Sequence, residues 1–335
     1  MLSLEILCPS LLAPIPERTG LKFQAPAIER LLARADRLAG SDRDPIEVLL
    51  RTAGVDWPAG DAAPSAPVAL LGEGVEVESE AIWMHADPIH LRPDRDRLLV
   101  YAGPGVAPEP DEAEALVAAF NRHFVEDGVR LIAPSPQRWY LRLPQPPGLR
   151  TRPLHQIQGG SMAEHLPRGP ESRDWMRLLN ETQMLFHAEP VNRQREATGR
   201  PLISGIWIWG AGSRPALSGQ GPDALIGDHP ALSGLARLAA RPHRSLKAWQ
   251  NDPLPTAGRQ LVFWDRHWRA WLAHDLEAWT RATSELDAVI ERLWNPLRAG
   301  RLDAIRLDPC DGAAFRITSR QTRRFWRRRA TLPVA

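Results

Sequence analysis

The chain has few cysteines and almost no lysine. Cys8 and Cys310 are the only cysteines among its 335 residues, too few for the disulfide framework of a small secreted domain. Lys22 and Lys247 are the only lysines, so 40 of the 42 residues counted as Lys or Arg are arginines. The formal net charge is nevertheless only +2, which predicts no general affinity for polyanions.

Long apolar runs and common catalytic motifs are also missing. No stretch approaches the length of a membrane span, and the first residues lack the basic region and apolar run of a secretion signal. We therefore expect a cytoplasmic protein with no membrane partner. The sequence contains no Gly-x-x-x-x-Gly-Lys loop, no Gly-x-Gly-x-x-Gly after a strand and no Gly-x-Ser-x-Gly elbow. Nucleotide binding and serine-hydrolase chemistry consequently have no motif to support them.

The segment 187–212, HAEPVNRQREATGRPLISGIWIWGAG, joins a polar cluster to an apolar strand. Residues 202–209 are apolar enough for a buried strand, and two glycines end it where the chain must turn. The asparagine and arginines upstream carry N–H donors suited to an anionic oxygen. A helix cap with solvated arginines and core tryptophans is the structural alternative. We predict a site for a small anionic metabolite, contacted by Asn192, Arg193, Arg195, Trp207, Trp209, Gly210 and Gly212.

A second polar group lies at residues 85–90, HADPIH. We predict that His85 and Asp87 contact a polar ligand at a strand end. A three-ligand metal site would also need His90 on the same side. Strand alternation places His85 and His90 on opposite faces unless Pro88 bulges the chain, so a structural turn is the alternative.

The order of expected elements predicts two domains. A small α+β unit is expected from strands at 75–83, 89–91, 98–101, 129–132 and 139–143 and a helix at 109–125. A mostly parallel sheet is expected from the strands 4–8, 203–209, 224–226, 260–264 and 304–307, which alternate with helices, among them 25–38, 45–52 and 171–186. Residues 60–67, GDAAPSAP, read as a linker. We therefore predict an α/β core from 1–66 and 171–335, interrupted by an inserted unit at 67–170.

The run from Arg320 to Arg329, RQTRRFWRRR, interleaves arginines with Phe325 and Trp326. Such a run can contact a nucleic-acid backbone and stack on bases. A terminal helix that packs both aromatic side chains inward, or an oligomer contact, explains it equally. Because the chain is nearly neutral overall, we do not expect nucleic acid as a partner.

The segment 187–212 resembles a motif of archaeal-type cofactor-independent phosphoglycerate mutases, His-Pro-x-Asn-x-x-Arg followed by Ile-Trp-Leu-Trp-Gly-x-Gly. The chain resembles more closely still a bacterial offshoot of that family, the RpfE-like phosphoglycerate-mutase-like proteins. Residues 70–78, LLGEGVEVE, and 112–121 are similar to further segments of the family. The resemblance implies an alkaline-phosphatase-like α/β core, with a mostly parallel sheet, helices on both faces and an inserted smaller α+β unit. The matching positions are His187, Pro190, Asn192, Arg195, Pro201, Ile206, Trp207, Trp209, Gly210 and Gly212.

The chain departs from that family at the catalytic positions. The resemblance implies two divalent metals, held by an Asp-Gly strand end and later Asp/His clusters, and a nucleophilic serine. Here Cys8-Pro9-Ser10 stands in place of Asp-Gly, and neither proline nor serine replaces a bridging carboxylate. The family's arginine-rich substrate segment is replaced by residues 100–108, VYAGPGVAP. The remaining metal-capable residues of the later cluster are Asp265, His267, His274 and Asp275.

Ser41, in Gly40-Ser41-Asp42, resembles the position of the nucleophilic serine, but it also reads as an ordinary helix cap. We expect a divergent protein that binds a phosphorylated sugar-acid-like anion without a cofactor, in a non-catalytic or regulatory role. The first alternative is an active phosphoglycerate mutase or phosphohydrolase that uses Mn, or Mg or Zn, with unconventional ligands. The second is an interaction protein that binds a macromolecule through its arginine-rich tail.

Overall fold

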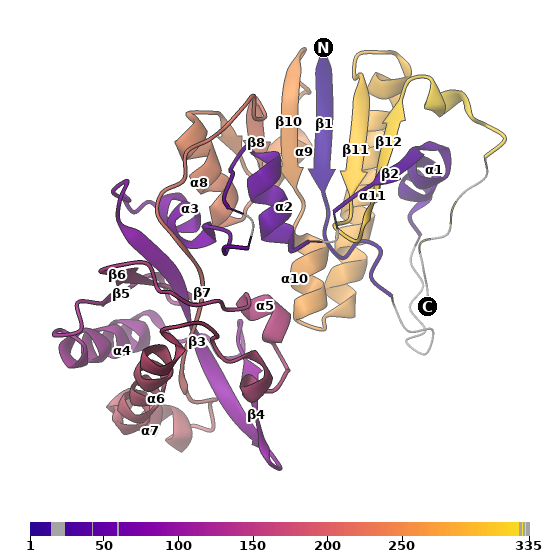
Figure 1. Ribbon diagram of the computed structural model, residues 1–335. Coiled ribbons are helices and arrows are strands. Elements are labelled where there is room, and N and C mark those ends of the chain that lie inside the picture. The colour runs from indigo at the N-terminus through magenta and orange to yellow at the C-terminus, as the bar shows by residue number, and fades with distance from the viewer. Residues whose placement is uncertain (15–23, 42, 59, 328–329, 331, 333–335) are drawn as a thin grey trace. The chain divides into compact units, whose positions relative to one another are not determined.

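The chain folds into two compact units (Figure 1). The computed structural model describes residues 1–14, 24–41, 43–58, 60–327, 330 and 332. Unit 1 comprises Met1–Val55 and Leu217–Ala335, and unit 2 comprises Asp56–Ala216. Unit 2 is therefore one continuous insertion, longer at both ends than the predicted 67–170. No helix in the described ranges is long and apolar enough to cross a membrane.

Unit 1 contains a seven-stranded, mostly parallel sheet. The central strand β1 (Leu2–Leu7) is parallel to both of its neighbours. The one strand that runs against its neighbours is β12, next to the edge. The predicted parallel sheet is confirmed for this unit. The order across the sheet is β2 (Asp36–Ala39), β12 (Ala313–Thr318), β11 (Ala304–Asp308), β1, β10 (Gly258–Phe263), β8 (Ala224–Ile226) and β9 (His243–Arg244).

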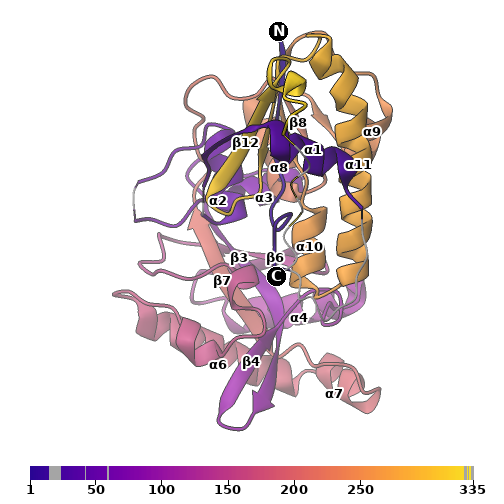
Figure 2. The same cartoon turned by 90° about the vertical axis from the view of Figure 1, so that its right-hand side faces the viewer.

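Helices cover both faces of this sheet (Figure 2). Leu2, Leu4 and Ile6 alternate along β1, so they share one face and pack into a core with α1, α9 and α11. The predicted helix 25–38 ends early because residues 36–39 pair with β12 as strand β2. The helices are α1 (Pro26–Arg34), α2 (Pro45–Thr52), α8 (Pro230–Ala239), α9 (Leu246–Asn251), α10 (Arg266–Leu272), α11 (Leu276–Arg298) and the short η3 (Gln321–Arg323).

Unit 2 contains an antiparallel sheet built around one long strand, β3 (Ile82–Asp94). This strand pairs with β4 (Arg97–Tyr101), β6 (Arg138–Leu143) and β7 (Gly205–Gly212), and β5 (Arg130–Ser135) pairs with β6. The prediction that β7 belongs to the parallel sheet is wrong. A fully apolar strand has the same sequence pattern in either sheet, so its pattern could not assign it.

The two faces of the unit 2 sheet differ in character. Met84 and Ala86 of β3 lie in an apolar core with α4 and α6, whereas Ile89, Leu91 and Trp207 pack on the opposite face. The predicted linker 60–67 is partly wrong, because α3 starts at its end and all but the last of that helix's residues are buried. The helices are α3 (Ser65–Gly72), α4 (Pro110–His123), α5 (Leu154–Ile157), η2 (Met162–His165), α6 (Ser172–Ala188) and α7 (Pro190–Ala197).

Two polar side chains of α7 are buried inside unit 2. Asn192 donates to the carbonyls of Phe186 and Ile203, each at 2.8 Å, and accepts from the Ile203 amide at 2.8 Å. Arg195 is 1% exposed and donates to Glu112, to the Val106 carbonyl and to the Pro201 carbonyl. Both side chains therefore form hydrogen bonds inside the protein and do not face solvent.

Replacing Arg195 should destabilise unit 2 strongly. Arg195→Met leaves the buried Val106 carbonyl and the Pro201 carbonyl without this donor and removes one partner of Glu112, so we expect a loss of about 2–4 kcal/mol. The matched control is Arg193→Met on the same helix, where the exposed side chain donates to the Ala188 carbonyl and to no other described residue, and the loss should stay below about 1 kcal/mol. Urea unfolding followed by circular dichroism measures both, and equal losses would contradict the structural role of Arg195.

Candidate functional site

Three strand ends meet at the carboxyl edge of the unit 1 sheet. The Cys8 amide donates to the Asp308 carbonyl at 2.8 Å, and the Trp264 amide donates to the Leu7 carbonyl at 2.8 Å. Asp308 is the last residue of β11, and Asp265 follows two residues after β10. In open α/β sheets this edge is where ligands and catalytic groups are found.

Cys8 belongs to a buried chain of hydrogen bonds. Its Sγ lies 3.4 Å from His267 Nδ1, and His267 Nε2 lies 3.1 Å from Thr283 Oγ1. Thr283 Oγ1 in turn donates to the Trp279 carbonyl at 3.0 Å. These partners assign the thiol and the imidazole N–H as donors in sequence. Cys8, His267 and Thr283 then all have hydrogen-bond partners while remaining neutral.

Burial keeps this Cys–His pair neutral. It raises the pKa of the Cys8 thiol well above its ordinary value and lowers the pKa of His267 to about 3. An activated nucleophilic cysteine requires the opposite, a thiolate stabilised beside a cation. The described geometry therefore pairs Cys8 with His267 as a neutral thiol donor and imidazole acceptor at this edge.

The two acidic side chains at this edge have different surroundings. Asp308 accepts from the Cys310 amide at 2.9 Å and from Arg306 at 2.9 Å. Asp265 is 2% exposed, and its Oδ1 has no hydrogen-bond partner among the described residues. Desolvation raises the pKa of Asp265 from 3.8 to about 6, partly offset by nearby Arg269. Asp265 is thus a buried carboxyl group with one oxygen still available.

The four predicted metal ligands do not come together. Asp265 and His267 are buried, whereas His274 and Asp275 lie exposed where α10 gives way to α11. The Asp275 side chain caps α11 by accepting from the Ala278 amide at 2.8 Å. Within the described ranges no three His, Cys, Asp or Glu side chains are placed to share a metal ion. The donor set present here does not fit a two-metal centre.

Ser41 has an ordinary loop environment. Its hydroxyl accepts weakly from the Arg43 amide at 3.3 Å, and its carbonyl accepts from the Gly312 amide at 3.0 Å. The residue that caps α2 is Asp44, which accepts from the Ile46 amide at 2.9 Å, so the expected cap at Ser41 is wrong. Asp42, the third residue of that motif, lies outside the described residues.

In unit 2 the strand pairing brings together the two predicted polar groups. His85 lies opposite Trp209 of β7 and opposite Tyr140 of β6. The rings of His85 and Trp209 stack with centroids 3.9 Å apart and an interplanar angle of 14°. Trp209 Nε1 donates to Asp87 Oδ2 at 2.8 Å. His85, Asp87 and Trp209 therefore form one cluster on the face opposite α4 and α6.

This cluster contains buried polar atoms that the described residues leave unbonded, namely Asp87 Oδ1, Tyr140 Oη and Ser65 Oγ. Desolvation raises the pKa of Asp87 from 3.8 to about 7, against the lowering effect of the Trp209 hydrogen bond. Burial also raises the pKa of Tyr140 well above its ordinary value. The cluster can therefore offer O–H donors near neutral pH to a polar ligand.

The remaining residues predicted in β7 have packing roles. Trp207 is fully buried and donates to the Arg152 carbonyl at 2.8 Å. Gly210 has φ +64°, and a Cβ there would lie 2.1 Å from Ser65 Oγ. At Gly212 a Cβ would lie 2.6 Å from the Cβ of Pro64. Both glycines let β7 approach the start of α3 closely.

The arginine-rich tail is described only as far as Arg327, and Arg328 and Arg329 lie outside the described residues. The alternative of a terminal helix with inward-packed aromatics is wrong for the described part of the run, where η3 is followed by turns and Phe325 and Trp326 are 80% and 66% exposed. The Arg324 guanidinium donates to Asp36 Oδ1 at 2.5 Å and to the Arg34 carbonyl at 3.0 Å.

Sequence reasoning missed two partners in these clusters. Thr283 lies 16 residues from His267 and meets it only because α10 and α11 pack together. Tyr140 meets His85 only through the register of β3 and β6. Neither contact has a local sequence signal, since both depend on tertiary pairing.

Comparison with known proteins gives partial sequence matches to one enzyme family, although no protein-family model matches the chain. The chain is 40% identical over 70 residues to 2,3-bisphosphoglycerate-independent phosphoglycerate mutase 2 of Methanothermobacter thermautotrophicus, covering 21% of this chain and 17% of that protein. It is 26% identical over 179 residues to the 2,3-bisphosphoglycerate-independent phosphoglycerate mutase of Methanosarcina barkeri, covering 53% and 43%. The matches therefore span less than half of either mutase.

A solved structure shares the fold over almost the whole chain. The PH0037 protein from Pyrococcus horikoshii superimposes with a TM-score of 0.56 at 14% sequence identity, covering 94% of this chain and 87% of that one. Together with the mostly parallel sheet of unit 1 and the inserted unit 2, this confirms the predicted α/β fold class. The chain is thus similar to phosphoglycerate mutases over part of its sequence, and it shares its fold with the PH0037 protein.

A side chain at Gly210 should destabilise the protein in two ways, through the strain of its positive φ and through a clash with Ser65. Gly199→Ala is the matched control, because Gly199 has φ +68° and nothing within 4 Å of a new Cβ; it should cost about 1–2 kcal/mol. Gly210→Ala adds the clash with Ser65 and should cost about 1–3 kcal/mol more. Adding Ser65→Ala should recover part of the difference in urea unfolding. Equal costs at the two glycines would contradict the close approach.

The protonation of Asp87 should make stability depend on pH. The folded protein keeps this proton up to a pKa of about 7, whereas the unfolded chain releases it near pH 4. The free energy of unfolding should therefore fall as the pH rises from about 4 to about 7. Asp87→Asn removes the group that titrates. The free energy of unfolding of the variant, relative to that of the wild type, should therefore rise by about 2 kcal/mol or more between pH 4 and pH 8. An unchanged difference in chemical unfolding at the two pH values would contradict the raised pKa.

Proposed function

We propose that this protein binds a small phosphorylated, sugar-acid-like anion and does not carry out two-metal phosphoryl transfer. The partial sequence matches to phosphoglycerate mutases support the choice of ligand class. We also propose that the protein is related to the bacterial RpfE-like proteins, because segment 187–212 resembles theirs. A binding or regulatory role follows if the metal chemistry is absent.

The observation that carries the proposal is the pairing of Cys8 with His267 at the end of β1. The resemblance requires a metal-bridging carboxylate at this strand end. A neutral thiol that donates to a neutral imidazole offers neither the negative charge nor the oxygen ligand that a hard divalent ion needs. His267, one of the residues considered as a metal ligand, has both ring nitrogens occupied by Cys8 and Thr283.

The ligand contacts that fit this proposal lie in unit 2. Asp87 and Tyr140 carry buried oxygens without partners among the described residues, and Trp209 is partly exposed beside them. Hydroxyl groups of a sugar acid can bond to such oxygens, because each can donate and accept near neutral pH. Asn192 and Arg195, by contrast, would have to break buried hydrogen bonds before they could meet a ligand.

An active metal enzyme is the alternative, and Asp265 favours it. A buried carboxyl group with an unbonded oxygen and a pKa raised to about 6 is the kind of group found at catalytic sites. In this alternative Asp265 would hold Mn, Mg or Zn at the carboxyl edge of the unit 1 sheet. Phosphoryl transfer would then depend on ligands that the described arrangement does not assemble.

Metal content and turnover distinguish these two functions. We expect the purified protein to bind well below one equivalent of metal and to show no mutase or phosphatase activity with added Mn²⁺. We also expect 3-phosphoglycerate to give saturable heat in isothermal titration with EDTA present, and glycerate to bind more weakly because it lacks the phosphate. About two equivalents of metal, with turnover lost in Asp265→Asn, would establish the enzyme instead.

The double substitution Cys8→Asp with Pro9→Gly supplies a control for the metal assay. It restores the acidic strand end that the resemblance implies, and the new buried carboxylate should raise Mn²⁺ binding above the wild-type level. Cys8→Ser, which adds no charge, should leave metal binding unchanged. Absence of any heat with 3-phosphoglycerate, in the wild type at all metal concentrations, would reject the proposed ligand class.

A further inference from the structure

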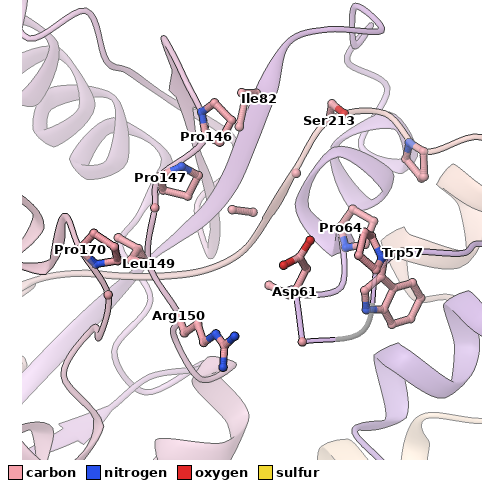
Figure 3. A pocket seen from close by; sticks show the side chains of 18 of the residues that line it. Trp57, Asp61, Pro64, Ile82, Pro146, Pro147, Leu149, Arg150, Pro170 and Ser213 are labelled. Carbon is pink, nitrogen blue, oxygen red and sulfur yellow. The ribbon is translucent and has the colours of Figure 1, made fainter.

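Unit 2 contains a cavity of about 750 Å³ that is formed only by its own residues. Figure 3 shows Pro146, Pro147, Leu149 and Pro170 on one side and Trp57 and Pro64 on the other. The carboxyl group of Asp61 and the guanidinium group of Arg150 lie between them in this view. The volume is within the range of small-molecule sites.

Two arginines are held directly opposite each other in the lining. The Arg150 amide donates to the Arg168 carbonyl at 2.6 Å, and the Arg168 amide donates to the Arg150 carbonyl at 3.0 Å. In an antiparallel pair of this kind the two side chains leave on the same side. Like charges placed directly opposite repel each other, so this arrangement favours an anionic group that contacts both.

No protein group neutralises these charges within the described parts of the chain. No ion pair there joins Arg150 or Arg168 to a carboxylate, whereas Arg138 pairs with Glu73 and Arg142 pairs with Glu78 in the same unit. Asp61 likewise forms no ion pair with a described residue, and it lines the same cavity. The cavity therefore offers charges of both signs to a ligand.

The walls are apolar and rigid. Proline fixes its own φ, so the run of prolines holds its shape without a ligand. The Pro147 carbonyl accepts from the indole N–H of Trp175 at 2.9 Å, which anchors this wall to a buried side chain near the start of α6. On the other side, the lack of a side chain at Gly212 lets β7 pack against Pro64. A preformed apolar slot reduces the entropic cost of binding.

We propose that this cavity binds a small zwitterion with a large apolar body, of the amino-acid type. The anionic end would contact Arg150 and Arg168, the cationic end Asp61, and the apolar body the ring of Trp57 and the facing prolines. Phosphoglycerates have no apolar body to cover these walls, so this site is additional to the anion binding proposed above.

Isothermal titration of the whole protein with three related probes tests this proposal. L-tryptophan carries both charges, indole-3-propionate lacks the ammonium group and tryptamine lacks the carboxylate. We expect tryptophan to bind roughly tenfold or more tightly than either analogue, because each analogue leaves one charge of the site without a partner. No saturable binding of tryptophan, or equal affinity for all three probes, would overturn the proposal.

Two variants assign the contacts. Asp61→Asn should weaken tryptophan binding roughly tenfold and leave indole-3-propionate unchanged, whereas Arg150→Gln with Arg168→Gln should weaken both of these ligands. Arg142→Gln is the matched control, because Arg142 lies in the same unit, pairs with Glu78 and does not line this cavity. A loss of affinity in Arg142→Gln equal to that in the double variant would overturn the assignment. Unfolding curves establish that each variant is folded.

Discussion

The antiparallel pairing of β3 with β7 is the constraint on which unit 2 depends. It joins residues 83–89 to residues 205–212, more than 100 positions apart, and so closes the inserted unit as a single sheet. It also draws α6 and α7 into this unit, since they lead directly into β7. The stack of His85 on Trp209 and the hydrogen bond from Trp209 to Asp87 exist only in this register. A shift by one residue would turn these side chains to the opposite face.

Burial, rather than the presence of charged residues, decides what the polar groups of this protein can do. Asp87 and Asp265 both lie in surroundings that disfavour their charged forms, and each keeps one unbonded oxygen within the described structure. Cys8 and His267 are equally buried, but each satisfies the other, so no reactive charge develops. The same desolvation therefore favours the protonated form of both carboxyl groups and of the thiol.

Local sequence patterns predict many of the helices and strands, but they do not predict which sheet each strand joins. The helix at residues 45–52 is confirmed because Asp44 and Pro45 form a strong amino-terminal signal that needs no tertiary partner. Strand β7 was assigned to the wrong sheet because an apolar run fits any buried strand. The insertion at 67–170 was too short for the same reason, since its end depends on which sheet β7 joins. At the site, the stacked pair of His85 and Trp209 required a register that no local pattern contains.

The segment that carries the resemblance to phosphoglycerate mutases is explained here by packing. Asn192, which follows α6, donates to the Ile203 carbonyl just before β7. Arg195 of α7 donates to Glu112 of α4. The missing side chain at Gly210 leaves room for Ser65. Each of these contacts stabilises unit 2 and involves no reacting group. The motif can therefore be maintained by its contribution to folding alone, whatever the chemistry of the protein. For this reason similarity in the motif argues for a shared fold, and the chemistry has to be inferred from the side chains at the strand ends of unit 1.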